Sequence, residues 1–184
     1  TADEPSKGRS THLSKSGMDG QLKRFGWEYG AAGVAAVLAE ENTRAAIFDA
    51  MKSKETYATT GPRIRVRFFC GFEFTADDMK RRDLAQVGYS NGVPMGGKLS
   101  NATACKAPAF LVYSLREPLG ANLDRIQIIK GWLDKEGKSH VRIFDVAVSD
   151  DREMGPDGRC TTHVGDTIDL SIPSWTNTIG DPEL

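Results

Sequence analysis

The sequence has few cysteines, no excess of one charge and no long apolar run, and each absence excludes a class of protein. Its three cysteines allow at most one disulfide and form no CxxC pair, which argues against a disulfide scaffold and a zinc knuckle. The 24 basic and 25 acidic residues give a net charge of −1, so nucleic-acid binding would need a local basic patch. The longest apolar stretch, residues 31–39, falls far short of the roughly 20 residues that a membrane-spanning helix needs. We predict no nucleic-acid partner and no membrane span.

What the chain does contain is an ordinary composition over a modest length. A hydrophobic fraction of 39% over 184 residues is enough for one folded domain with an appendage. The chain begins at Thr1 rather than Met, and it stops soon after residues 175–179, which have the composition of structured chain. We interpret it as a piece of a longer protein, so the absence of a signal peptide says nothing about secretion.

The first 60 residues combine a polar leader with one strand and one helix. Residues 1–30 are rich in Gly, Ser and Lys, which predicts an ordered surface loop. Residues 33–39 are typical of a strand buried on both faces, and Asn42 is the expected N-cap of a helix over residues 43–54. This helix has an apolar face of Ile47, Ala50 and Met51. A buried strand followed by such a helix is half of a βαβ unit, so residues 1–60 are predicted to end an α/β domain.

After residues 59–62 the pattern changes to that of an antiparallel β domain. Apolar and basic residues alternate over residues 64–68, which predicts a strand with one face in water. Further strands are expected over residues 110–115, 123–133, 140–148 and 167–172, with a hairpin turn at 134–138, a helical turn over 77–84 and a glycine-rich loop over 88–97. The predicted fold class is α+β, in which residues 61–184 form an antiparallel, β-sandwich-like domain that is truncated at its C-terminus.

Two acidic residues stand where α/β folds place their ligand sites. Glu40 and Glu41 follow the predicted strand, and ligands bind at the carboxyl ends of parallel strands. They are therefore site-proximal candidates, although no catalytic residue is assigned. The alternative is that Glu41 only complements the positive end of the following helix dipole.

The three histidines show no metal-ligand spacing. His12 is a candidate metal ligand or phosphate contact in the polar leader, or else a solvated loop residue; His140 and His163 are expected on the surface. Other polar groups are interpreted as structural. The loop at residues 92–98 lacks P-loop spacing, Asp150, Asp151 and Asp157 form a solvated acidic loop, and Arg63, Arg65 and Arg67 form a basic stripe that is a solvent face or a salt-bridge partner. Asn101 matches a glycosylation sequon, which is a weak signal by itself.

Several segments together resemble a bacterial family of uncharacterised proteins, known only as a domain of unknown function. They are AEENTRAAIFDAM (residues 39–51), KETYATTGPR (54–63), GVPMGG (92–97), GANLDRIQIIKGW (120–132) and WTNTIG (175–180). The resemblance covers nearly all of residues 27–184. The N-terminal part of that family is similar to the polymerase-and-histidinol-phosphatase (PHP) metallohydrolases, and its members are often exported, which implies a periplasmic or secreted location.

The PHP resemblance implies a distorted β/α barrel whose His, Asp and Glu residues hold two or three divalent metals, such as zinc, manganese or iron, for attack by water on a phosphoester or related bond. This chain has no HxH motif, and Ser10 stands where the family's Asp-x-His motif has its Asp, with His12 as the remaining match. We therefore expect no cofactor in the piece itself. Residues 33–39 and 43–54 would be the last strand and helix of the barrel.

Two hypotheses follow for function. In the first, the parent is a metal-dependent PHP-type hydrolase and this piece is a non-catalytic scaffold. In the second, the chain is a β-sandwich binding or interaction module with no hydrolase role. The apolar face of the helix over residues 43–54 needs a partner in either case, which would be the remainder of the parent domain or a second copy of the chain.

Overall fold

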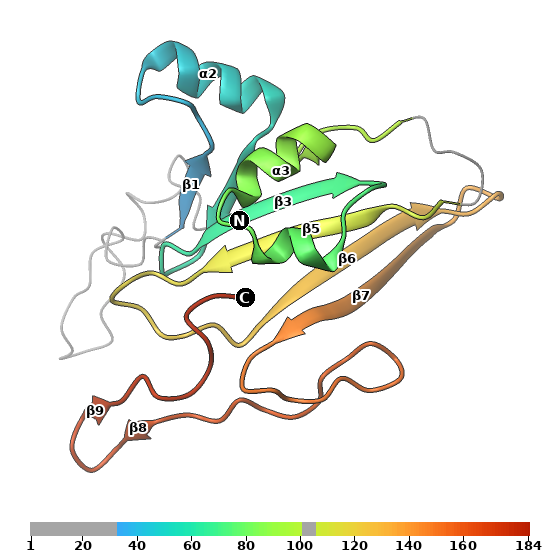
Figure 1. Cartoon of the computed structure of the whole chain (residues 1–184). Helices are drawn as coiled ribbons and strands as arrows, with labels where there is room; N and C mark the ends of the chain where they lie inside the picture. The colour runs from blue at the N-terminus through green and yellow to red at the C-terminus, as the bar shows by residue number, and fades with distance from the viewer. Residues whose placement is uncertain (1–32, 101–105) are drawn as a thin grey trace, which may run out of the picture.

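A computed structural model describes residues 33–100 and 106–184 of the chain. The expectations for residues 1–30, which include His12, and for Asn101 lie outside these described residues. Within them the fold is mixed α+β, as expected, with two α-helices, a short 3-10 helix and four small antiparallel sheets (Figure 1). The sheets of the described part do not close into a barrel. Neither described α-helix is long and apolar enough to cross a membrane.

The first sheet pairs β1 (Val34–Val37) with β2 (Thr56–Thr59), and α2 (Arg44–Ser53) connects them. The pairing is antiparallel, so the expected half of a parallel βαβ unit is wrong. The cause is Lys54, which ends the helix in the left-handed region at φ 63°, where Lys54 N–H donates to Met51 and Glu55 N–H to Ala50. This cap turns the chain back along β1. The strand is also not buried on both faces within the described part, because Val34 is 42% exposed.

The central sheet has the order β4 (Gly92–Pro94), β3 (Arg65–Gly71) and β5 (Ala109–Leu115). The core lies on one face of this sheet, where α3 (Leu84–Asn91) packs against it. Phe69 and Leu111 are each 1% exposed and form the core with Val87 of α3. The short 3-10 helix η2 (Ala76–Lys80) precedes α3 and matches the expected helical turn.

The expected glycine-rich loop over residues 88–97 is instead the end of α3 followed by β4. Its glycines serve close packing rather than flexibility. A Cβ on Gly88 would lie 2.4 Å from the Phe69 ring, and one on Gly92 would lie 2.5 Å from the carbonyl oxygen of Cys70. Glycine therefore lets the helix and the edge strand approach β3 closely.

The predicted hairpin is confirmed as β6 (Arg125–Leu133) and β7 (Ser139–Val148). The last expected strand, over residues 167–172, is instead a small hairpin of β8 (Ile168–Asp169) and β9 (Ser174–Trp175). Its turn forms because Oδ1 of Asp169 accepts hydrogen bonds from the N–H groups of Ser171 and Ile172.

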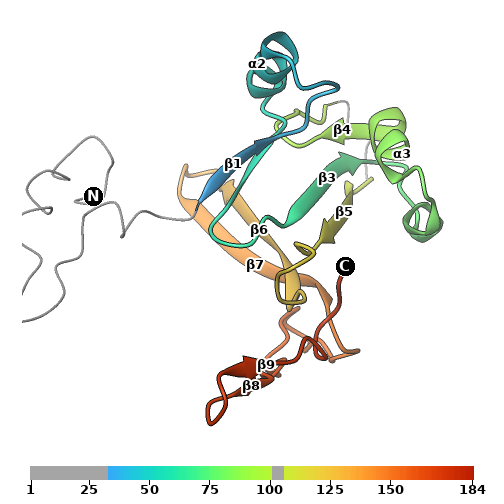
Figure 2. The same ribbon diagram turned by 90° about the vertical axis from the view of Figure 1, so that its left-hand side faces the viewer.

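The helix α2, the β8–β9 hairpin and the last residues of the chain lie in different parts of the described fold. Figures 1 and 2 both show α2 at one end of the molecule and the β8–β9 hairpin at the opposite end. The final residues return to the centre, where Ser114 and Leu184 exchange two backbone hydrogen bonds of 2.8 and 3.0 Å. Residues 182–184 thus pair with the outer edge of β5 at its C-terminal end.

Candidate functional site

A pocket of about 560 Å³ lies between the carboxyl end of β1 and one face of the central sheet. The sheet contributes Arg65 and Arg67 from β3 and Tyr113 and Leu115 from β5. Because the ladder pairs Arg65 with Leu115 and Arg67 with Tyr113, these four side chains project from the same face. The other walls are Val37, the last residue of β1, with Leu38 and Ala39 just after it, together with Tyr57 of β2 and Val66 of β3. We call this the basic pocket.

The two guanidinium groups give the basic pocket its positive charge. Among the described residues, no Asp or Glu forms an ion pair with Arg65 or Arg67. The carboxylate of Glu183 instead accepts a 3.0 Å hydrogen bond from the Tyr113 hydroxyl. Burial, together with this bond and the Glu183 charge, raises the pKa of Tyr113, and the positive charge of Arg65 opposes that rise.

Arg67 has a similar neighbourhood. The Tyr89 hydroxyl donates a hydrogen bond to Glu55. Burial and then this bond raise the pKa of Tyr89, against the opposing charge of Arg67. Each arginine therefore lies near a tyrosine whose hydroxyl already donates a hydrogen bond to a carboxylate.

Glu40 and Glu41 follow Ala39, at the edge of the basic pocket, and both are exposed. The N-cap of α2 is Thr43 rather than the expected Asn42, since Thr43 Oγ1 accepts from the Ala46 N–H at 3.3 Å. The same hydroxyl donates to Glu41 Oε1 at 2.9 Å. Glu41 is therefore hydrogen-bonded to the N-cap of α2, where its negative charge also interacts favourably with the positive end of the helix dipole. The site-proximal role of both residues stays a prediction.

The histidines do not assemble a metal centre in the described part. His140 Nε2 lies 2.7 Å from Asp134 Oδ2, and its ring stacks on Trp132 with centroids 5.2 Å apart. His163 is exposed in a loop. Across residues 33–100 and 106–184, no three His, Cys, Asp or Glu residues gather to hold a metal ion. These residues alone do not fit the metals that the PHP resemblance implies.

The acidic loop has structural contacts. Asp150 accepts from the Gly180 N–H at 2.7 Å, and the Asp150 N–H donates to Asp181 at 3.1 Å. Asp157 accepts from the Arg159 N–H at 3.1 Å. These hydrogen bonds fix turns and join the loop to the C-terminal segment.

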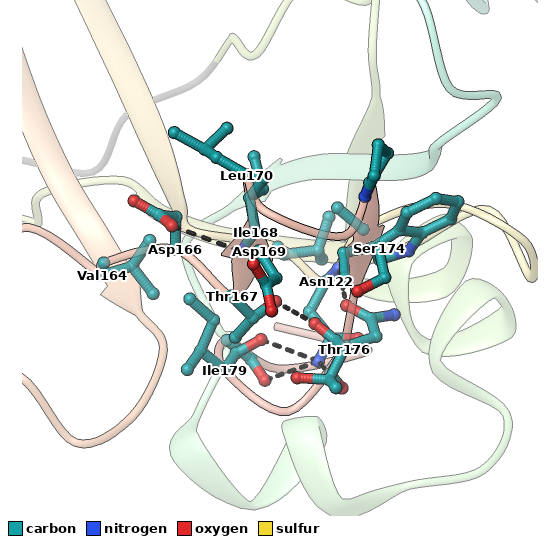
Figure 3. Close-up of a pocket in the computed structure, with 17 residues that line it drawn as sticks. Asn122, Val164, Asp166, Thr167, Ile168, Asp169, Leu170, Ser174, Thr176 and Ile179 are labelled. Atoms are coloured by element: carbon teal, nitrogen blue, oxygen red, sulfur yellow. Dashed lines mark hydrogen bonds between the residues drawn. The ribbon is translucent and has the colours of Figure 1, made fainter.

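A second cavity, of about 590 Å³, lies under the β8–β9 hairpin (Figure 3). Its apolar walls include Ile168, Leu170 and Trp175, which are 62%, 90% and 74% exposed. The Asn122 side chain closes one side, where its amide donates 2.9 Å hydrogen bonds to the carbonyls of Ile179 and Gly180. Most polar groups here hold the loop together, and the cavity surface is left mainly apolar.

The sequence indicates the arginine stripe only as a solvent face or a salt-bridge partner, and it does not single out Tyr57 or Tyr113. The alternation of residues 64–68 was a sufficient signal that Arg65 and Arg67 share a face. The position of β1 and β2 beside this face depends on contacts between residues distant in sequence, and no local sequence pattern predicts such contacts.

Comparison with curated proteins gives no match, and comparison with solved structures gives none. A family model does match, over residues 2–184. The chain therefore belongs to the family described as Protein of unknown function (DUF3604).

Proposed function

We propose that this chain is part of a metal-dependent hydrolase of the PHP type, which cleaves a phosphoester or related bond, and that it serves there as a non-catalytic scaffold. In this proposal residues 1–60 belong to the PHP-like α/β domain, and residues 61–184 form a β domain packed against it. The sequence motifs over residues 27–184 support the hydrolase class. The apolar side chains of α2 that are exposed among the described residues support the scaffold role.

These exposed apolar side chains of α2 are the observation that carries the proposal. Of the expected face, Met51 is 55% exposed, whereas Ile47 is half-buried and Ala50 is 6% exposed; Phe48, outside that face, is 63% exposed. In addition, β1 pairs only with β2 among the described residues, so its second edge has no described strand beside it. Exposed apolar side chains on a helix, beside a strand edge that no described strand pairs with, form a surface that a further protein layer would cover. The remainder of the PHP-like domain is the proposed partner, and a second copy of the chain is the alternative.

No catalytic step is assigned to the described residues, because they do not gather a metal-binding group. When bound elsewhere in the protein, the metals would supply an activated water and neutralise the leaving oxygen. Glu40 and Glu41 would lie at the junction between the barrel and the scaffold. His12 is the one residue of the chain that we propose as a metal ligand.

The experiment uses the natural protein that contains this sequence, and the 184-residue chain alone. Hydrolysis of p-nitrophenyl phosphate and bis(p-nitrophenyl) phosphate is measured with Mn²⁺ or Zn²⁺, and again with a chelator. We expect chelator-sensitive hydrolysis by the natural protein and none by the chain. Double substitution Glu40→Gln and Glu41→Gln should lower the rate, whereas the exposed control Asp49→Asn should not.

Two results would contradict the proposal, and they separate its two parts. Absence of metal-dependent hydrolysis by the natural protein over a broad ester panel would contradict the hydrolase class. Hydrolysis by the 184-residue chain would contradict the scaffold role.

The cavity in Figure 3 favours a second candidate, a binding module. A volume of about 590 Å³ lies within the range of small-molecule sites, and Trp175 offers an exposed aromatic surface. Indole is a suitable probe because it matches this apolar wall. Binding of indole that Trp175→Ser abolishes would support the module, and equal binding by that variant would exclude this cavity as its site.

A further inference from the structure

We propose that the basic pocket binds a small aromatic oxyanion, a compound in which a phosphate, sulfate or carboxylate group is attached to an aromatic ring. Arg65 and Arg67 would bind the oxyanion, and Tyr57 and Tyr113 would contact the ring. This proposal needs no metal and no catalytic group, so it stands independently of the proposed hydrolase function.

The positive charge is the first observation. Arg65 and Arg67 lie two residues apart on β3, which places their Cα atoms roughly 7 Å apart on one face of the sheet. Neither has an Asp or Glu ion-pair partner among the described residues. Two guanidinium groups that share a pocket repel each other, and an oxyanion between them would remove that repulsion. Arginine suits this role because its planar fork donates two hydrogen bonds to one oxyanion.

The walls are the second observation. A volume of about 560 Å³ is within the roughly 300–1,000 Å³ of typical ligand pockets. Tyr57 and Tyr113 line it together with Leu38 and Leu115, so the space beside the arginines is aromatic and aliphatic. A bare inorganic ion would leave this apolar space empty, whereas an aryl group would fill it.

The hydrogen bond of the Tyr113 hydroxyl indicates which part of this side chain would contact the ligand. Because the Tyr113 hydroxyl donates its proton to Glu183, it has none left for a bound anion. The ring of Tyr113, and not its hydroxyl, is therefore the part that should matter. Tyr113→Phe is predicted to keep most of the affinity, whereas Tyr113→Ala should lose it.

The 184-residue chain is titrated with phenyl phosphate, benzoate and inorganic phosphate, and binding is measured by calorimetry and by ¹H–¹⁵N NMR. We expect the best aromatic anion to bind more tightly than inorganic phosphate. The double variant Arg65→Gln and Arg67→Gln should weaken its binding at least about tenfold, since charge-assisted hydrogen bonds are lost. Arg63→Gln is the matched control, because Arg63 is exposed and does not line the pocket. The NMR spectrum of each variant shows whether it is folded.

Each outcome decides the proposal. Tighter binding of either aromatic anion than of inorganic phosphate would support it. A preference for phenyl phosphate would indicate a tetrahedral head group, and a preference for benzoate a planar one. If neither aromatic anion binds, if the folded double variant binds as well as the unaltered chain, or if inorganic phosphate binds as tightly as the better of the two aromatic anions, the proposal is overturned.

Discussion

Replacing Asp145 should destabilise the β6–β7 hairpin and the loop that follows it. The Asp145 side chain is 0% exposed and accepts hydrogen bonds from Gln127 Nε2 at 2.6 Å and the Cys160 N–H at 2.7 Å. Arg125 donates a further bond at 3.2 Å. Arg159 Nε lies 3.4 Å away without hydrogen-bond geometry, so it contributes mainly charge. One carboxylate thus joins both strands to the chain near Cys160.

The magnitude follows from what Asp145→Ala would leave behind. Removing one partner of a buried ion pair costs about 3–5 kcal/mol, because the remaining charge and donors lose their acceptor. We expect a loss of about 3 kcal/mol, at the lower end of this range, since Arg125 also pairs with Asp124 at 2.8 Å. Asp145→Asn should lower the free energy of unfolding by less than Asp145→Ala does, but still clearly, because the amide keeps the shape of the carboxyl group and loses its charge.

The pH dependence has a definite sign. Burial alone would raise the pKa of Asp145, but the Cys160 N–H, the Gln127 amide and the charges of Arg159 and Arg125 outweigh it and lower the pKa below 3.8. The stabilisation is therefore complete above about pH 3.8 and is lost as the pH falls through the lower folded-state value. The Asp145 variants should accordingly lose most of their stability deficit in acid.

Urea unfolding followed by circular dichroism and tryptophan fluorescence measures these differences. Asp77→Ala is the matched control, because its ion pair with Lys80 is exposed and should contribute less than about 1 kcal/mol. An Asp145→Ala chain within about 1 kcal/mol of the unaltered protein at pH 7 would refute the reasoning.

Two further predictions concern packing and the hairpin turn. Gly88→Ala should destabilise the chain by about 1–3 kcal/mol in a thermal or urea melt, because its Cβ would meet the Phe69 ring, whereas Gly61→Ala has open space and should change stability little. His140→Ala should raise the pKa of Asp134 toward its ordinary value, because the His140 hydrogen bond is the largest cause of its lowering. An NMR titration of the carboxyl carbon of Asp134 measures this directly, and an unchanged midpoint would contradict the assignment.

The sequence predicted best those elements whose cause is local. The hairpin over residues 123–148 followed from its turn, where Asp134 accepts two backbone N–H bonds and Gly137 has φ 80°. The helix over residues 43–54 followed from its amphipathic pattern and differs from α2 by one residue at each end.

The elements that were predicted wrongly depend on contacts distant in sequence or on unusual local choices. The antiparallel return of β2 depends on Lys54 in a left-handed conformation that glycine usually takes. The glycines after Leu84 indicated a loop, yet Gly88 and Gly92 are there because aromatic rings and backbone lie against them. The basic pocket needs β1 and β2 to face Arg65 and Arg67, which no periodicity reveals.

Metal content tests the central claim, that this chain is a scaffold without its own metal centre, most directly. The purified 184-residue chain is exchanged into chelator-free buffer and measured by elemental mass spectrometry. The account predicts zinc, manganese and iron well below one ion per chain. Near-stoichiometric metal would contradict it, because a centre built with His12, Glu40 or Glu41 would then exist within the chain.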